Sequence, residues 1–127
     1  MAEAEAMYRR ALEGREKAWG PEHTSTLDTV HNLGILYKDQ GKMAEAEAMY
    51  RRALEGRENA WGPEHTSTLD TVHNLGILYK DQGKMAEAEA MFRRVKNENL
   101  NELPTSPPTT RRFVTFIYYV LIFFPLP

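Results

Sequence analysis

The sequence repeats itself with a period of 42 residues, and this repeat is the feature that most limits what the chain can fold into. Residues 1–42 and 43–84 align without a gap and differ only at Lys17, which corresponds to Asn59. A third copy starts at Met85 as MAEAEAMFRR and departs from the repeat after Val95. Such a period is too long for a heptad and is typical of stacked supersecondary units, each of which packs only on its neighbours.

Composition excludes several classes of protein. The chain has 127 residues, about one domain's worth. Its net charge of -2 gives no electrostatic reason to expect nucleic acid as a partner. The chain has no cysteine, which excludes disulfides and thiolate chemistry and permits a reducing compartment. The acidic, alanine-rich N-terminus is not a secretory signal, and we expect a cytoplasmic location.

The first half of each unit predicts a helix over 25–40. Its apolar and small residues recur at steps of three and four, as on one face of a helix: Leu27, Val30, Leu33, Gly34 and Tyr37. Ser25 is the predicted N-cap, with Asp28 three residues on in a variant of the capping box. Gly41 is the predicted helix stop, because glycine adopts a left-handed conformation at no steric cost.

The second half predicts a helix over 43–61 that packs on the first. Its inner stripe consists of Ala46, Met49, Tyr50, Ala53, Leu54, Arg57 and Trp61. Gly56 lies inside this helix and predicts a bend or a close contact. Helices joined by a turn of about two residues lie antiparallel, as a hairpin. Since one hairpin cannot bury this stripe alone, the next unit must stack on it.

These residues resemble the tetratricopeptide repeat (TPR). The matches to that family's signature are Val30, Leu33, Gly34, Tyr37, Ala46, Tyr50 and Ala53, and again Val72, Leu75, Gly76, Tyr79, Ala88 and Phe92. The segments HNLGILY, DQGK, AEAEAMYRRALEG and WGPEHT resemble the 42-residue repeats of kinesin light chain. The resemblance implies an all-α fold, a solenoid of TPR helical hairpins wound into a right-handed superhelix. It also implies a non-enzymatic protein-interaction module.

The predicted TPR array covers 1–98 and begins in the middle of a unit. Residues 1–19 are a second helix without its partner, and two units follow at 25–61 and 67–98. The chain therefore reads as a truncated piece of a longer array, or as a gene model started at an internal methionine. The unpartnered helix and the apolar C-terminal tail each expose a face, so we expect self-association.

A proline-rich linker is predicted over 99–112, followed by an apolar tail over 113–127. We favour read-through or a wrongly joined exon as the origin of this tail. Two alternatives are a segment that folds back on the last helix and a membrane anchor. The anchor over 113–124 is less favoured, because these residues would rise only about 18 Å as a helix, against a hydrocarbon core of about 30 Å.

Catalytic, metal and cofactor sites find no support in the sequence. The four histidines, His23, His31, His65 and His73, are two positions that occur twice, without a second ligand at metal-compatible spacing. His23 and His65 precede a helix start, which favours a turn or capping role. The glutamates of MAEAEA are typical of a solvated helix face.

The predicted peptide-binding groove lies on the first helix of each unit, whose outward residues line the concave face in TPR proteins. In this chain they are Asp28, His31, Asn32, Ile35, Lys38, Asp39, Asp70, His73, Asn74, Ile77, Lys80 and Asp81. Asn32 and Asn74 match the asparagine with which kinesin light chain holds an extended peptide backbone. Lys38 and Lys80 favour an acidic peptide. Asp28 and Asp70 replace the lysine of carboxylate-clamp TPRs, which argues against capture of a C-terminal carboxylate.

The sequence leaves two functions open. The first is a peptide-binding adaptor of the kinesin-light-chain type. The alternative is a structural fragment of a longer TPR sensor array from a nucleotide-binding (STAND-type) receptor, without a ligand of its own.

Overall fold

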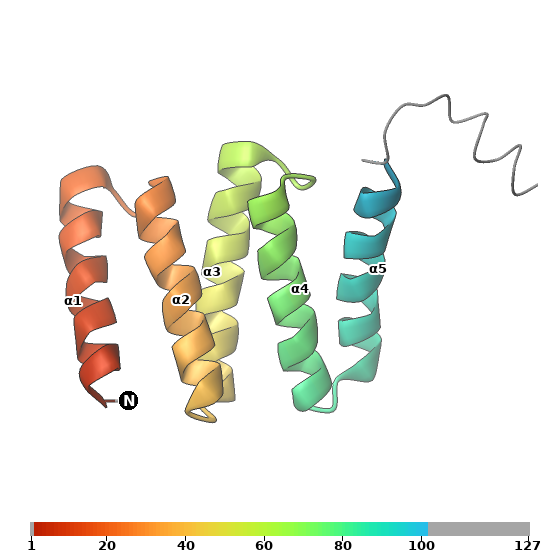
Figure 1. The fold of residues 1–127 in the computed structure, drawn as a ribbon, viewed down its shortest axis with the longest axis horizontal. Coiled ribbons are helices and arrows are strands. Elements are labelled where there is room, and N and C mark those ends of the chain that lie inside the picture. The colour runs from red at the N-terminus through yellow and green to blue at the C-terminus, as the bar shows by residue number, and fades with distance from the viewer. Residues whose placement is uncertain (1, 102–127) are drawn as a thin grey trace, which may run out of the picture.

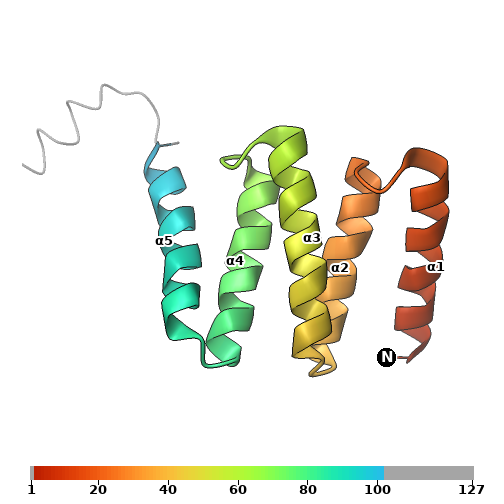
Figure 2. The ribbon, with the colours of Figure 1, turned by 180° about the vertical axis from the view of Figure 1, so that it is seen from behind.

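The computed structural model describes residues 2–101, with side chains for residues 2–97. This part of the chain consists of five helices: α1 (Ala2–Trp19), α2 (Thr24–Asp39), α3 (Met43–Trp61), α4 (Thr66–Asp81) and α5 (Met85–Asn101). The helices run alternately up and down and follow one another along a single direction (Figure 1). α3 lies behind α2 in Figure 1 and in front of it in Figure 2, so consecutive helices are staggered into two layers.

Two hairpins, α2–α3 and α4–α5, are closed by the same short turn. Gly41 (φ 78°) and Gly83 (φ 79°) adopt the left-handed conformation that a side chain disfavours, which confirms the predicted helix stop at Gly41. The amide of Lys42 then donates to the carbonyl of Tyr37 at 2.8 Å, and Lys84 repeats this bond with Tyr79.

The core runs between the helices and contains the predicted stripe of α2. Leu27, Val30, Leu33, Gly34 and Tyr37 are all buried. On α3 the prediction holds for Ala46, Tyr50, Ala53 and Arg57, whereas Met49 and Leu54 are half-buried. It is wrong for Trp61, whose residue is 37% exposed and whose ring stacks on His65 at 4.8 Å between ring centroids. Burial of each large apolar side chain contributes about 1.5–3 kcal/mol.

Two glycines set how closely α2 and α3 approach. A Cβ on Gly34 would lie 2.9 Å from Cδ1 of Tyr50, and one on Gly56 would lie 2.5 Å from Cδ2 of Leu27. Real Cβ atoms essentially never come this close to a neighbour. The close contact that the sequence predicts at Gly56 is therefore confirmed, and Gly34 and Gly76 lie at the hairpin contact as expected.

The helix starts differ from the prediction at one position. The N-cap of α2 is His23, not Ser25, because the extended backbone of His23 lets its ring Nδ1 accept the amide of Ser25 at 3.1 Å. His65 caps α4 in the same way through Ser67. The capping role expected for these two histidines is confirmed.

The C-terminal region is described only as far as Asn101. α5 continues through 99–101, so the first residues of the predicted linker are helical. The rest of the linker, 102–112, and the apolar tail, 113–127, lie outside the described residues. None of the helices that the structure describes combines the length and the apolar character that crossing a membrane requires.

The contrast between Gly14 and Gly56 yields the first prediction. Both lie in the sequence LEGRE, but a Cβ on Gly14 would meet no atom within 4 Å. Alanine favours a helix by about 1 kcal/mol over glycine. We therefore expect Gly14→Ala to raise the melting temperature. At Gly56 overpacking against buried Leu27, which costs about 1–3 kcal/mol, should outweigh that gain, so Gly56→Ala should lower it. Thermal unfolding followed by circular dichroism tests this, and equal shifts would contradict the tight α2–α3 contact.

Candidate functional site

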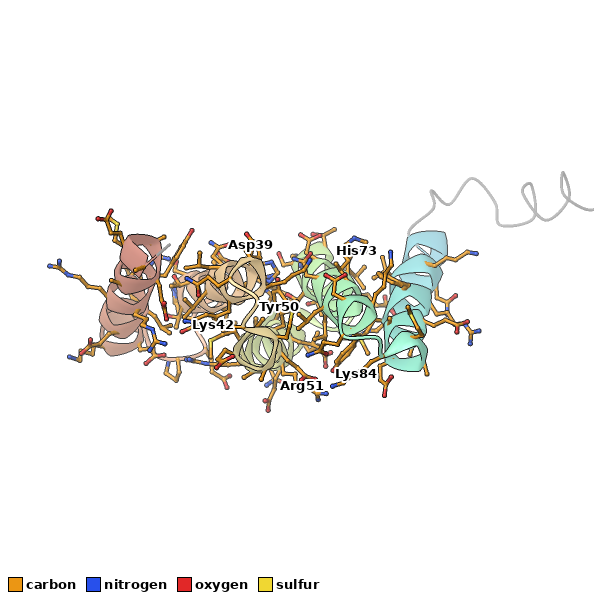
Figure 3. All side chains as sticks on the ribbon, turned by 90° about the horizontal axis from the view of Figure 1, so that it is seen from below. Asp39, Lys42, Tyr50, Arg51, His73 and Lys84 are labelled. Carbon is orange, nitrogen blue, oxygen red and sulfur yellow. The ribbon has the colours of Figure 1, made fainter. Side chains whose placement is uncertain are left out.

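The predicted groove residues come from α2 and α4, and we call the surface that they form the α2–α4 face. Figure 3 places the labelled Asp39 and His73 on one side of the molecule and Arg51 and Lys84 on the opposite side. The α2–α4 face therefore belongs to the layer of first helices, as expected from the sequence.

Side chains of this face connect one first helix to the next. The amide Nδ2 of Asn74 lies 3.0 Å from Nε2 of His31. Lys38 Nζ lies 3.6 Å from the Oδ2 of Asp81. The structure thus brings four of the predicted residues together in two contacts between α2 and α4. These four side chains hold neighbouring repeats in register, which the sequence did not reveal.

His31 is buried, although its copy His73 is exposed. Its residue is 8% exposed, and its ring tilts against that of Tyr50 with 5.5 Å between centroids. Burial, helped by the positive charge of Arg57, lowers the pKa of His31 from 6.5 to about 4, while Asp70 and Asp28 oppose this shift. His31 is therefore neutral at pH 7.

The hydrogen bonds around His31 assign its tautomer. Asn74 donates its amide hydrogen to Nε2, which leaves the ring proton on Nδ1, 3.3 Å from Oγ1 of Thr71. The Thr71 hydroxyl donates to the carbonyl of Ser67 at 3.3 Å, so it accepts from the histidine. Both ring nitrogens of His31 and the Thr71 hydroxyl therefore have partners, as burial demands.

Arg57 connects three helices and is the main residue whose role the sequence did not show. It is 6% exposed, and its Nη1 donates to the carbonyl of Ser67 at 3.0 Å and to Oγ1 of Thr71 at 2.8 Å. Its Nη2 donates to Oδ1 of Asp28 at 2.9 Å. An arginine within an otherwise apolar stripe was the available signal. Asp28 therefore compensates a buried charge.

The other predicted residues keep their side chains accessible. Asn32 and Asp39 are exposed on α2, and Ile35 between them is 37% exposed. On α4, Asp70, His73 and Lys80 are exposed, and Ile77 is half-buried. The accessible part of the face thus offers an amide, carboxylates, one imidazole and one ammonium around two isoleucines.

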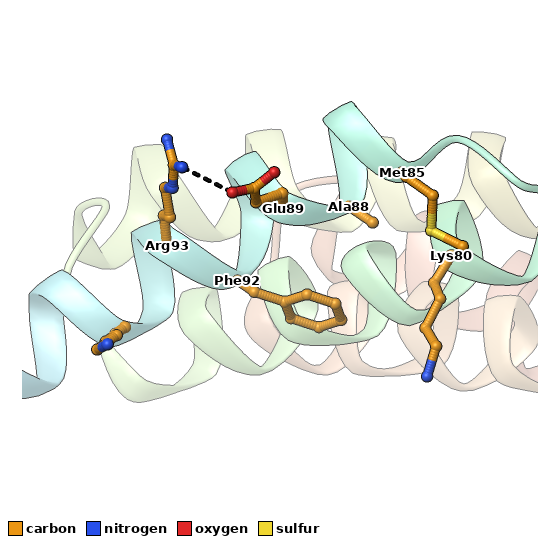
Figure 4. Close-up of a pocket in the computed structure, with 7 residues that line it drawn as sticks. Lys80, Met85, Ala88, Glu89, Phe92 and Arg93 are labelled. Atoms are coloured by element: carbon orange, nitrogen blue, oxygen red, sulfur yellow. Dashed lines mark hydrogen bonds and ion pairs between the residues drawn. The ribbon is translucent and has the colours of Figure 1, made fainter.

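A hollow beside α5 was not predicted. Its floor is apolar and its rim is charged, and it is lined by Lys80, Met85, Ala88, Glu89, Phe92, Arg93 and Lys96 (Figure 4). Arg93 and Glu89 form an ion pair at 2.6 Å on its rim. Among the described residues no three His, Cys, Asp or Glu side chains gather to hold a metal ion.

Comparison with known proteins agrees with this architecture. The model of the tetratricopeptide repeat family matches residues 1–59 and 30–97. No sequence among the curated proteins matches the chain.

Several solved structures share the fold, and two of them illustrate the likeness. One is BtubC (BKLC) from P. vanneervenii, which is 24% identical with a TM-score of 0.75 over 90% of this chain and 45% of that one. The other is a putative kinesin light chain with nearly identical TPR-like repeats from Podosopora anserina, with 24% identity, a TM-score of 0.74, and 85% and 51% covered. The chain spans about half the length of these proteins. The predicted all-α TPR solenoid with repeats like those of kinesin light chain is confirmed.

The environment of His31 predicts a pH dependence of stability. The unfolded chain binds this proton near pH 6.5 and the folded chain only near pH 4, so stability falls as the pH drops through that window. Between pH 7.5 and pH 5 we expect a loss of about 2 kcal/mol from this group. Chemical unfolding at both pH values measures it.

Two glutamine variants make this test specific. His31→Gln should lower stability at pH 7.5 but remove most of the loss between pH 7.5 and pH 5. His73→Gln is the matched control, since the exposed His73 has the same sequence neighbours, and it should keep the pH dependence of the wild type. The same pH dependence in His31→Gln and in the wild type would show that His31 is not the group responsible.

Proposed function

Because the chain belongs to the tetratricopeptide repeat family, we propose that it is a non-enzymatic module that holds an extended peptide of a partner protein against the α2–α4 face. Tetratricopeptide repeats are generally protein-interaction scaffolds. The shared fold with kinesin-light-chain-like repeats supports an adaptor role of that type.

The exposed amide of Asn32 is the observation that carries this proposal. Asn32, Ile35 and Asp39 follow one another at steps of three and four on α2, so they occupy one stripe of the helix. A carboxamide both donates and accepts, which matches the N–H and C=O of an extended peptide unit. Ile35 beside it offers apolar area for a side chain of the peptide.

Lys80 is the residue that would select an acidic partner. Lys38, the other lysine of the face, is already 3.6 Å from Asp81 and is largely compensated. The exposed Lys80 is screened by salt, so the selectivity should weaken as ionic strength rises. Asp70 and Asp39 on the same face disfavour a terminal carboxylate and favour an internal peptide segment.

The expectations of a cytoplasmic location and of no cofactor, metal or nucleic-acid partner belong to the same proposal. An interaction module of this kind needs none of those ligands. The alternative function, a structural fragment of a STAND-type sensor array, has the same fold and differs in having no peptide ligand.

Peptide titration tests the proposal. We would titrate short tryptophan-containing peptides, in acidic, neutral and basic versions, against the full chain at low and high salt, using fluorescence anisotropy. Asn32→Ala should weaken binding of every version about threefold to tenfold, the worth of one or two net hydrogen bonds. Lys80→Ala should weaken only the acidic version, and only at low salt.

Asn59→Ala is the matched control, because Asn59 is an exposed asparagine on α3, outside the α2–α4 face. Its affinity should equal that of the wild type. Equal affinities for Asn32→Ala and the wild type would remove the α2–α4 face as the binding site. The absence of binding by all peptides would favour the structural fragment.

A further inference from the structure

The contact between the two repeats is a template for a contact that the described residues leave open at the α4–α5 end. Within the chain, the edge formed by α2 and α3 receives α4. Besides the contacts of Arg57 and His31 with α4 through Ser67 and Thr71, three side-chain pairs span this junction: His31 with Asn74 at 3.0 Å, Lys38 with Asp81 at 3.6 Å, and Arg51 with the Tyr79 hydroxyl at 2.6 Å.

The edge formed by α4 and α5 carries the receiving residues of these three pairs, although Asn99 replaces Arg57. Residues 66–81 are identical to 24–39, and MAEAEAMFRR of α5 differs from the start of α3 only in Phe92 for Tyr50. His73, Lys80 and Arg93 therefore occupy the positions of His31, Lys38 and Arg51. Among the described residues, His73 and Lys80 have no side-chain polar partner, and Arg93 has only Glu89 on its own helix. The hollow of Figure 4, floored by Met85, Ala88 and Phe92, lies on this edge.

The residues that α4 contributes to the template have identical copies on α2. Asn32, Tyr37 and Asp39 occupy the positions of Asn74, Tyr79 and Asp81. Asn32 and Asp39 are exposed. A helix with the sequence of α4 would complete the α4–α5 edge, and α2 has that sequence.

We propose that two copies associate head to tail, with the α4–α5 edge of one copy bound to the face of α2 that α1 covers in the other. This contact pairs His73 with Asn32, Lys80 with Asp39, and Arg93 with Tyr37 of the second copy. It is a different proposal from peptide binding. It engages the Asn32 amide that a peptide would use, but leaves that residue partly accessible, because Asn74, which makes the equivalent contact within the chain, stays half-exposed.

The second copy's own α1 must give way, and its packing allows this. α1 is bound to α2 by Arg9, which donates to the Tyr37 hydroxyl at 2.5 Å, and by Arg15, which donates to the Ser25 carbonyl at 3.2 Å and to the Thr29 hydroxyl. Two ion pairs, Glu16 with Arg52 at 2.7 Å and Glu5 with Lys42 at 3.6 Å, also hold α1 in place. However, none of the described residues of α1 is buried. The α4–α5 edge replaces the bond of Arg9 with that of Arg93 and does not replace the bonds of Arg15, since Asn99 stands at that position. It adds two pairs that α1 cannot form, because no first helix precedes α1 in the described chain.

Charge reversal across the junction tests the proposal in the full chain. Lys80→Glu alone and Asp39→Lys alone each place like charges opposite one another, so each should raise the dissociation constant about tenfold. An equimolar mixture of the two variants should associate as tightly as the wild type, because every mixed junction again pairs opposite charges. The double variant should behave in the same way. Sedimentation velocity over a concentration series measures the dissociation constants of the two single variants, their mixture and the double variant. Asn59→Lys, which adds a charge at an exposed position of α3 outside the junction, is the control and should associate like the wild type.

Weakening α1 should have the opposite effect. Arg15→Ala removes two hydrogen bonds between α1 and α2 but no bond of the new junction, since α5 has Asn99 at the corresponding position. It should tighten association about threefold. A wild type that stays monomeric would overturn the proposal. Equal dissociation constants for the wild type and both single charge-reversal variants would also overturn it and would point to residues 102–127. A mixture of the two variants that associates no more tightly than each variant alone would overturn it as well. If Arg15→Ala associates no more tightly than the wild type, the displacement of α1 by the second copy is wrong.

Discussion

A buried guanidinium holds the stack of helices together. Arg57 lies in the contact between α3 and its neighbours, and it must find acceptors there because an unpaired buried charge is costly. It finds them on both sides: Asp28 on α2, and the Ser67 carbonyl and Thr71 hydroxyl on α4. Arg15 repeats the contacts with the following helix, through Ser25 and Thr29. One arginine on each of α1 and α3 therefore orients the first helix that follows.

The network around Arg57 also decides how the α2–α4 face differs between its two repeats. Thr71, which accepts from Arg57, also lies beside the ring of His31, and the guanidinium contributes to the low pKa of that ring. His31 consequently stays neutral and accepts the amide of Asn74. The identical His73 has no following first helix among the described residues and remains exposed. Position in the stack, and not sequence, makes one histidine a structural residue and the other an available one.

Peptide binding and head-to-tail association use the same property of the fold. A repeat array is open at both ends, because each hairpin is completed only by its neighbour. The groups that join α2 to α4 inside the chain therefore recur as accessible groups on α2 and on the α4–α5 edge. Asn32 can meet a peptide backbone or the ring of His73 in another copy. Since the internal equivalent of this second contact leaves Asn74 half-exposed, association would lengthen the face that a peptide can follow.

Much of the fold could be predicted from local patterns, and so could the family to which the repeats belong. The apolar spacing of α2, the stop at Gly41 and the small residues at the hairpin contact are consequences of helix geometry and steric size, which adjacent residues determine. A turn or capping role was expected for His23, but the N-cap itself was assigned to Ser25, because serine is the commoner N-cap and the ring nitrogen reaches the Ser25 amide only in the observed backbone conformation. Trp61 was misplaced because its ring stacks on His65, outside the core. The partners of the face residues could not be predicted at all, since identical copies such as His31 and His73 differ in burial and pairing. The physical reason is that local sequence sets backbone conformation, whereas burial and charge compensation depend on neighbours roughly one repeat away, which are present on one side of a helix and absent on the other.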